Sequence, residues 1–343
     1  MKQMIQLTIM VSFLVNAMAA GNVADGPNFI GAQNLDFAVY PVYETILTPA
    51  PSRDSIALIA ARVSSNPLSG LGVLEQKSSS SLSWLGPDGE QLSFRSNEEI
   101  EEFLRTAEIV SRKRVGEGIN NPLKVLLEKD GIQMYAVFRD VHVESSQRKM
   151  NDGTTKFFFR DDAGFECAAY ELSKLLGLNT VPPAVERKIR GQQGTLQAWV
   201  ENVTTEKALR KETDVPPSGG INRWRWVMQR QNIYIFDNLI YNEDRNTGNL
   251  LIEPDWKRLW MIDHTRAFRR WKELMNPEQV QFAERSLWEK LQALDETEVR
   301  ERLEKFLNPF ELNGLIERKG LLIDHIQKLI DERGEKAVLF TMR

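Results

Sequence analysis

Three polar residues within the segment 236–268 have the types and the spacing to hold a metal-bound phosphate donor. Asp244 precedes Asn249 by five residues, and Asp263 follows Asp244 by nineteen, directly after the apolar run 259–262. In phosphoryl transfer one carboxylate orients the acceptor hydroxyl and takes its proton, while an amide and a second carboxylate hold the metal that bridges the phosphates. Asp-x4-Asn alone would favour an ordinary polar loop between a helix and a strand, but the addition of Asp263 at a strand end favours phosphoryl transfer.

A helix and a strand are expected to position these residues. Residues 222–241 carry apolar side chains at helical spacing, so a helix there would deliver Asp244 to the loop that follows it. Further helices are expected near residues 277–293, 295–307 and 309–333. Residues 202–343 therefore predict a mainly helical region that carries the loop.

The preceding residues, 106–201, predict a strand-rich region. Residues 129–131 are typical of a hairpin turn, and the apolar runs on either side predict its two strands. A helix is expected from about residue 163 to 176. Further strands are expected at residues 156–159, 184–190 and 194–201, the first after a polar excursion at residues 141–155. This order predicts an α+β protein of two lobes, a strand-rich N-lobe and a mainly helical C-lobe.

Two glycines precede the first strand of the hairpin. Gly116 and Gly118 would let backbone amides approach phosphate groups closely, because glycine has no side chain to keep a ligand away. The alternative is ordinary turn chemistry, which a Gly-x-Gly pair beside a hairpin serves more often. The pair alone does not decide between these two interpretations.

Composition narrows the classes of protein. Of 343 residues, 42% are hydrophobic and 27% are charged, which is ordinary for a soluble globular chain with room for two lobes. The formal net charge of −4 argues against nucleic acid as the main partner. Cys167 is the single cysteine, so the fold does not depend on disulfide bonds. The three histidines are widely separated, and no His/Cys spacing indicates zinc.

The first twenty residues predict a signal peptide. Lys2 precedes a short apolar stretch, and small residues suited to cleavage end at Ala19 and Ala20. The alternatives are a buried N-terminal helix and an uncleaved anchor, although the stretch is short for a membrane span. We therefore expect an exported protein (periplasmic, in a secretory lumen or extracellular) with no stable membrane span after cleavage. Residues 21–105 are expected to form an N-terminal extension, to which the sequence assigns no role.

Two segments carry a family resemblance. YNEDRNTGNLLIEPDWKRLWMIDHTRAF, residues 241–268, resembles the atypical kinase group that includes HipA-type bacterial kinases, phosphatidylinositol kinases and secreted Golgi-type kinases. FECAAYELSKLLGLNTVPPAVER, residues 165–187, is also similar to that group, and the resemblance covers roughly residues 107–335. It implies a two-lobed protein-kinase-like fold that uses ATP with Mg²⁺ or Mn²⁺ to phosphorylate a hydroxyl acceptor.

The resemblance also implies roles for individual residues. Asp244 would be the catalytic aspartate, and Arg245 would organise its loop together with Asp237. Asn249 and Asp263 would bind the metal. Typical kinases have Phe-Gly directly after the metal-binding aspartate. Here His264-Thr265 follows Asp263 instead, a departure that the atypical groups tolerate. The nucleotide-binding residues implied are Arg139, Glu166, Gly116 and Gly118, with Glu166 as the glutamate of the N-lobe helix.

One departure from the family pattern concerns the cation that contacts ATP. The third strand offers Arg139 where family members usually have lysine, and arginine differs from lysine in reach and geometry. Three explanations stay open. Arg139 does the work, Lys124 or Lys156 reaches in from a neighbouring strand, or the protein is a weak or inactive kinase.

The same residues leave other functions open. A pseudokinase would bind nucleotide or a partner protein without transferring phosphate, and Arg139 favours it. Transfer of AMP in place of the γ-phosphoryl group is a further alternative, distinguished by the mass added to the product. The acceptor could be a protein, a lipid, a sugar or a small molecule, since nothing near the loop indicates one class. ATP is scarce outside the cytoplasm, so an exported enzyme would need a local supply or another donor.

Overall fold

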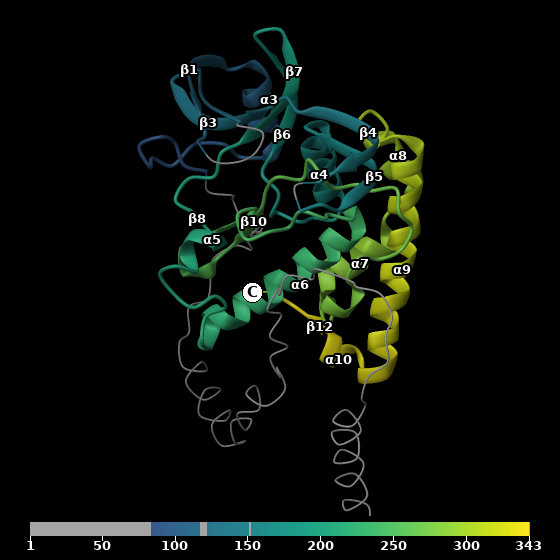
Figure 1. Cartoon of the computed structure of the whole chain (residues 1–343). Helices are drawn as coiled ribbons and strands as arrows, with labels where there is room; N and C mark the ends of the chain where they lie inside the picture. The colour runs from purple at the N-terminus through teal and green to yellow at the C-terminus, as the bar shows by residue number, and fades with distance from the viewer. Residues whose placement is uncertain (1–83, 117–121, 151, 343) are drawn as a thin grey trace, which may run out of the picture. The chain divides into compact units, whose positions relative to one another are not determined.

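A five-stranded antiparallel sheet and a group of helices make up most of what the structure describes (Figure 1). The computed structural model describes residues 84–116, 122–150 and 152–342. The expected signal peptide, most of the expected extension and Gly118 lie outside these residues. One hydrophobic core lies at the sheet and another among the helices. The α+β class expected from the sequence is therefore confirmed. Side chains between residues 165 and 184, in the expected N-lobe, belong to the core among the helices.

The sheet of the N-lobe has the strand order β1-β2-β3-β7-β6, and all neighbouring strands are antiparallel. The strands are β1 (Glu108–Arg114), β2 (Leu123–Lys129), β3 (Ile132–Arg139), β6 (Ala184–Ile189) and β7 (Gln192–Ala198). Asp130 and Gly131 join β2 to β3 in a two-residue turn, with left-handed φ angles of 53° and 75°. Such a turn matches the twist of the flanking strands, and it confirms the hairpin expected here.

A helix from the region that we expected to be a separate extension packs on this sheet. Helix α3 (Asn97–Thr106) begins after Ser96, whose hydroxyl accepts a hydrogen bond from the Glu99 amide at 3.4 Å. Its buried Phe103 and Leu104 share a hydrophobic core with side chains of β2, β3 and β7. The packing thus joins the described residues before 106 to the N-lobe.

A separate two-stranded sheet follows β3 in the chain. Strands β4 (His142–Lys149) and β5 (Thr155–Asp162) pair antiparallel. The sequence analysis expected only a polar excursion where β4 lies. Its side chains are nearly all polar and exposed, so they lack the alternation that identifies a half-buried strand. Helix α4 (Gly164–Leu175) follows β5 and agrees with the expected helix at 163–176.

The C-lobe is arranged around the helix α6 (Gly220–Ile240), which agrees with the helix expected at 222–241. The other helices are α5 (Glu206–Leu209), α7 (Arg285–Ala293), α8 (Glu296–Leu303), α9 (Pro309–Arg333) and α10 (Glu335–Val338). The short strands are β8 (Thr204–Thr205), β9 (Leu250–Ile252), β10 (Leu259–Met261), β11 (Ala283–Glu284) and β12 (Leu339–Phe340). The helix expected from residue 277 begins only at Arg285, because β11 pairs with β12 just before it.

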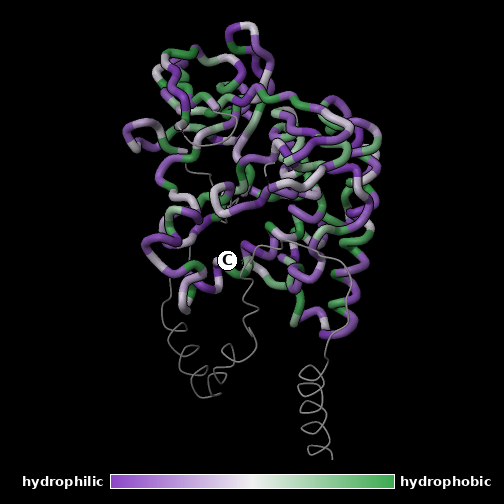
Figure 2. Tube along the Cα trace, viewed as in Figure 1, coloured by the Kyte–Doolittle hydropathy of each residue, from purple (hydrophilic) through white to green (hydrophobic). Residues whose placement is uncertain are grey.

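Helix α9 is held against α6 by apolar packing and by one buried arginine. Hydrophilic and hydrophobic residues are interspersed along α9 (Figure 2), and Leu322 and Ile326 are among the buried ones. Arg318 is fully buried and donates hydrogen bonds to the backbone oxygens of Leu239 at 2.8 Å and Arg269 at 2.9 Å. These bonds connect α9 to α6 and to the segment that follows β10.

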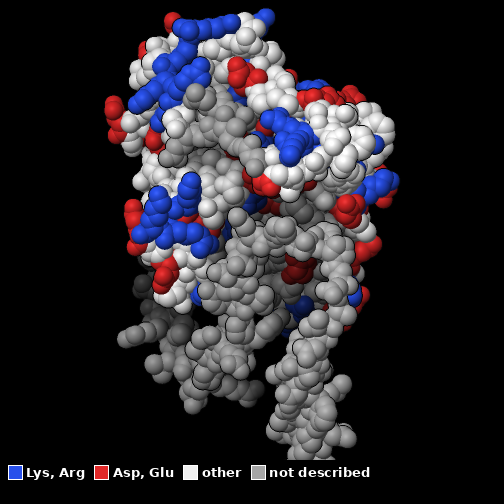
Figure 3. All heavy atoms as spheres, in the orientation of Figure 1, with Lys and Arg blue, Asp and Glu red and all other residues white. Residues whose placement is uncertain are grey.

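Basic side chains form a cluster at the sheet. Lys and Arg side chains gather over β1 on the face drawn in Figure 3, where Arg112, Lys113 and Arg114 are exposed. This cluster is confined to one short strand, and the whole chain carries a net charge of −4. Among the helices that the structure describes, none is both long and apolar enough to cross a membrane.

The N-terminus of α9 offers a test of the fold. The Asn308 side chain accepts from the Glu311 amide at 3.1 Å, and the Glu311 side chain accepts from the Asn308 amide at 2.9 Å. Replacing such a capping residue by alanine leaves backbone donors unpaired. We expect Asn308→Ala to lower the free energy of unfolding by about 1 kcal/mol, measured by urea denaturation. Gln327→Ala, an exposed change on the same helix, should cost less than half as much; equal losses would contradict the cap.

Candidate active site

Asp244 and Asn249 lie in one loop that begins where α6 ends. Tyr241, in the left-handed region with φ of 49°, ends the helix and turns the chain into the loop. Asn249 Nδ2 donates to the Asp244 backbone oxygen at 2.9 Å, and Asn246 Nδ2 donates to Asp244 Oδ1 at 3.2 Å. Because the Asn249 nitrogen is the donor here, its Oδ1 is the atom available to a metal. Strand β9 starts at the next residue and holds the far end of the loop.

Arg245 connects this loop to the two elements beside it. Its Nε donates to Asp237 Oδ2 of α6 at 3.1 Å. Its Nη1 donates to the backbone oxygens of Asn249 at 2.7 Å and Ile262 at 2.8 Å, and its Nη2 lies 2.9 Å from His264 Nε2. Arginine offers five donors in a rigid planar group, so one side chain can fix several segments at once. The geometry is what the expected loop-organising role requires of Arg245 and Asp237.

Asp263 follows β10 and is partly buried, with a left-handed φ of 59°. Thr265 Oγ1 donates to its Oδ1 at 3.3 Å. Burial raises the pKa of Asp263; Arg139 opposes this rise, while the Glu166 and Asp244 carboxylates add to it. The Asp263 carboxyl group therefore ionises less readily than an ordinary aspartate.

Arg139 of β3 and Glu166 of α4 form a buried ion pair. Arg139 Nη1 lies 3.6 Å from Glu166 Oε1, and the Glu166 side chain has no exposed surface. Gln197 bridges the pair, since it accepts from Arg139 at 3.3 Å and donates to Glu166 Oε2 at 3.3 Å. Burial alone would raise the pKa of Glu166, but the Arg139 guanidinium and the hydrogen bond from His264 lower it to about 2.

Both lysines that could have replaced Arg139 have partners elsewhere. Lys124 Nζ lies 3.4 Å from Glu201, just after β7, and Lys156 Nζ lies 2.6 Å from Glu243 in the loop of Asp244. Arg139 is the cation beside Glu166 in the structure. This geometry counts against the second of the three explanations, in which a lysine replaces Arg139, and leaves the other two open.

Sequence reasoning missed a further arginine at the site. Arg266 Nε donates to the buried Asp161 of β5 at 2.9 Å, and its Nη1 lies 3.4 Å from Asp244 Oδ2. A cation thus lies beside the expected catalytic carboxylate. Residues 161 and 266 are far apart in the sequence, and only the folded chain brings β5 next to the segment after β10. No spacing rule could therefore have predicted this contact.

The expected phosphate-approaching glycines remain a prediction. Gly116 lies in open space, since a side-chain carbon added there would meet no atom within 4 Å. Gly118 lies outside the described residues. A close approach of this turn to phosphate is therefore not tested by the geometry.

The oxygen donors at the site fit a metal ion that is coordinated partly by the protein and partly by the phosphates of a nucleotide. Among the residues that the structure describes, no three or more His, Cys, Asp or Glu side chains converge as a metal site. Mg²⁺ is usually held by one or two carboxylates together with substrate phosphates and water. Asn249 and Asp263 would supply two oxygen ligands, one from an amide and one from a carboxylate.

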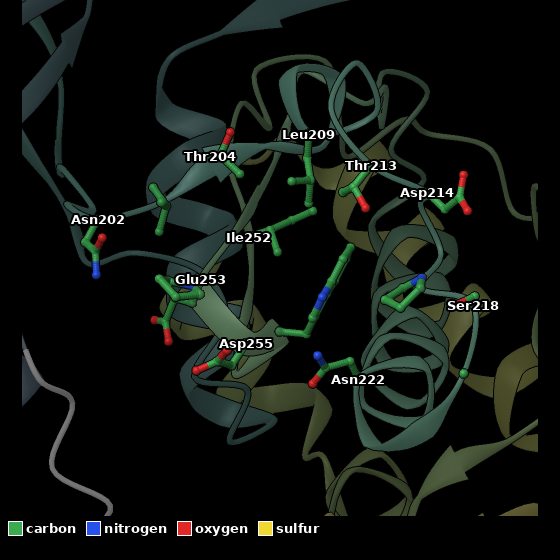
Figure 4. Close-up of a pocket in the computed structure, with 15 residues that line it drawn as sticks. Asn202, Thr204, Leu209, Thr213, Asp214, Ser218, Asn222, Ile252, Glu253 and Asp255 are labelled. Carbon is green, nitrogen blue, oxygen red and sulfur yellow. The ribbon is translucent and has the colours of Figure 1, made fainter.

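A cavity of about 660 Å³ lies beside the turn between β9 and β10. Figure 4 shows Asn202 and Glu253 on one side of it and Asp214 and Ser218 on the other. None of the expected site residues lines it. The sequence analysis did not anticipate this cavity, and it takes no part in the arrangement around Asp244.

Comparisons with known proteins bear on the family and the fold. Residues 226–313 match the family model described as HipA-like kinase. The solved structure of hydra Fam20 with sugar is 16% identical, covers 71% of this chain and 92% of that chain, and has a TM-score of 0.53. The Golgi casein kinase with Mn/ADP bound is 15% identical, with coverages of 71% and 78% and a TM-score of 0.51. No curated protein sequence matches the chain. The expected resemblance to atypical kinases and the kinase-like fold are thereby confirmed.

The charge at Asp263 predicts a pH-dependent effect on stability. Because the folded-state pKa is raised, the ionised carboxylate destabilises the metal-free protein above the ordinary aspartate pKa of about 4, and has no such effect below it. Asp263→Asn should therefore raise the melting temperature of metal-free protein near neutral pH, and the gain should shrink as the pH falls toward 4. Asp324→Asn, at an exposed position of α9, should show neither effect. A lower melting temperature for Asp263→Asn at neutral pH would contradict the assignment.

Proposed function

We propose that this chain, which has the fold of the atypical kinases, transfers the γ-phosphoryl group of ATP to a hydroxyl acceptor with the help of Mg²⁺ or Mn²⁺. The observation that carries the proposal is the contact between the Arg139–Glu166 pair of the N-lobe and the segment of Asp263. Arg139 Nη1 lies 3.6 Å from Glu166 Oε1, which accepts a hydrogen bond at 3.1 Å from the backbone amide of His264, the residue after Asp263. Two lobes thus contribute charged groups to one place, as binding and transfer of a triphosphate require.

The roles of the side chains follow from their positions. Asp244 would align the acceptor hydroxyl and take its proton as the oxygen bonds to the γ-phosphorus and the bond to ADP breaks. Arg139 would bind phosphate oxygens, while Glu166 holds its guanidinium in place at 3.6 Å. Asn249 and Asp263 would hold the divalent metal, which supplies charge neutralisation along the phosphates. Arg266, beside Asp244, would offer a further cation to the phosphoryl group or to the acceptor.

A pseudokinase is the second candidate, and Arg139 is the observation that favours it. Its guanidinium is shared between Glu166 and Gln197, so it differs from a lysine ammonium in shape and in the number of bonds it makes. Such a protein would bind nucleotide and metal without transfer. We further propose export, which rests on the composition of residues 1–20. The similar Golgi casein kinase belongs, by its name, to a secretory compartment.

Variants of the two aspartates test the proposal. Asp244→Asn should keep the affinity for ADP with Mn²⁺ within about threefold and lower kcat by about 10²–10⁴, since it keeps the shape of the side chain and removes the carboxylate that takes the proton. Asp263→Ala should abolish metal-dependent nucleotide binding. Binding is measured by calorimetry, and transfer by the mass added to a panel of protein, sugar and lipid acceptors. Full turnover by both variants would contradict the site assignment.

Variants of Arg139 separate the enzyme from the pseudokinase. Arg139→Lys keeps a positive charge and should retain turnover to within about tenfold, whereas Arg139→Met should lose about 10²-fold or more in kcat/KM because a charged contact to phosphate disappears. The measurement is phosphoryl transfer from ATP with Mn²⁺ at saturating acceptor. Nucleotide binding without transfer by both the natural protein and Arg139→Lys, across the whole acceptor panel, would establish the pseudokinase instead.

A further inference from the structure

His264 lies between the helix of the N-lobe and the catalytic loop of the C-lobe. It directly follows the expected metal ligand Asp263, at a position where typical kinases have phenylalanine. Its side chain has no exposed surface, yet both of its ring nitrogens have polar partners within hydrogen-bond distance. A buried polar ring in this place calls for an explanation beyond packing.

The contacts of His264 reach both lobes. Its backbone amide donates to Glu166 Oε1 at 3.1 Å, and its Nδ1 lies 2.9 Å from Glu166 Oε2. On the other side of the ring, Nε2 lies 2.9 Å from Arg245 Nη2. Arg245 in turn pairs with Asp237 of α6. One unbroken chain of hydrogen bonds therefore runs from α4 to α6 through His264.

The direction of these bonds follows from the chemistry of arginine. A guanidinium has donors only, so His264 Nε2 must accept the bond from Arg245. The proton of the neutral ring is then on Nδ1, where it donates to the Glu166 carboxylate. Arg245 thus selects the tautomer of His264, and that tautomer suits Glu166.

We propose that His264 is a positioning residue that holds Glu166, and through it Arg139, in the arrangement that nucleotide binding needs. The inference deepens the proposed function and rests on it for its purpose, but the link itself is a property of the fold. Glu166 is anchored on α4, whereas Arg245 is anchored on the loop of Asp244. Because the His264 ring is hydrogen-bonded to both side chains, it fixes the distance between Glu166 of the N-lobe and Arg245 of the C-lobe.

The alternative is that the ring only fills space. The Phe236 ring packs edge-on against His264 at 6.2 Å between centroids, so an aromatic ring has a place here whatever its polarity. Two substitutions separate the alternatives. His264→Phe keeps the ring and removes both side-chain bonds. His264→Asn removes the ring but can place an amide nitrogen near the position of Nδ1, where it can donate to Glu166.

The test is which of the two variants departs further from the natural protein in nucleotide binding and in amide hydrogen exchange of α4. If His264 positions Glu166, His264→Phe should weaken binding of ADP with Mn²⁺ by about 10–100-fold, as loss of an outer-shell partner does. His264→Asn should lie closer to the natural protein. Amide hydrogen exchange in α4 should be faster in His264→Phe than in His264→Asn. His325→Phe, the same change at a histidine that bonds the Val280 carbonyl, is the matched control and should leave both readouts unchanged.

The opposite order, with His264→Phe closer to the natural protein in α4 exchange, would overturn the inference and leave a packing role. A nitrogen-15 spectrum with the proton of His264 on Nε2 would also overturn it. Exchange and the spectrum need neither nucleotide nor transfer. If the natural protein neither binds nucleotide nor transfers a phosphoryl group, the proposed function is wrong. The comparison of α4 hydrogen exchange between His264→Phe and His264→Asn would still decide the role of His264.

Discussion

The arrangement of the site depends on a single buried carboxylate. Glu166 has no exposed surface and stays ionised, with a pKa of about 2, although burial by itself penalises its charge. A buried carboxylate is tolerated only where it is paired and hydrogen-bonded. Arg139 of β3, Gln197 of β7 and the His264 segment after β10 supply those partners. The charge of Glu166 thus requires the sheet, helix α4 and the segment after β10 to meet at one point.

Function and stability act in opposite directions at the neighbouring Asp263. Its pKa is raised by burial and by two nearby carboxylates, so the metal-free protein holds a charge that it does not favour. Sites that bind a divalent cation commonly accept this cost, because the cation reverses it on binding. On the proposed function, nucleotide phosphates would complete the coordination, so the described part of the chain would not need three acidic or histidine ligands.

The parts of the structure that could be predicted from the sequence are those with a local signal. Asp244 and Asn249 share one loop, and Asp263 follows a strand, so their spacing in the chain already reflects their spacing in the fold. Helix α6 and the β2–β3 hairpin have regular apolar patterns and a specific turn. Strand β4 escaped detection because its polar residues show no alternation. Asp161, Arg266 and the link through His264 depend on contacts between distant segments, for which one sequence offers no signal.

The measurement that tests the central claim most directly is the binding of Mn²⁺ followed by electron paramagnetic resonance, with and without ADP. We expect the signal of free Mn²⁺ to fall strongly when ADP and the natural protein are present together, and to fall no further than with ADP alone when Asp263→Ala replaces the natural protein. That result would mean that the protein binds the metal together with the nucleotide and that Asp263 is needed for it. Equal loss of the free signal with the natural protein and with the variant would contradict a metal–nucleotide site at Asp263.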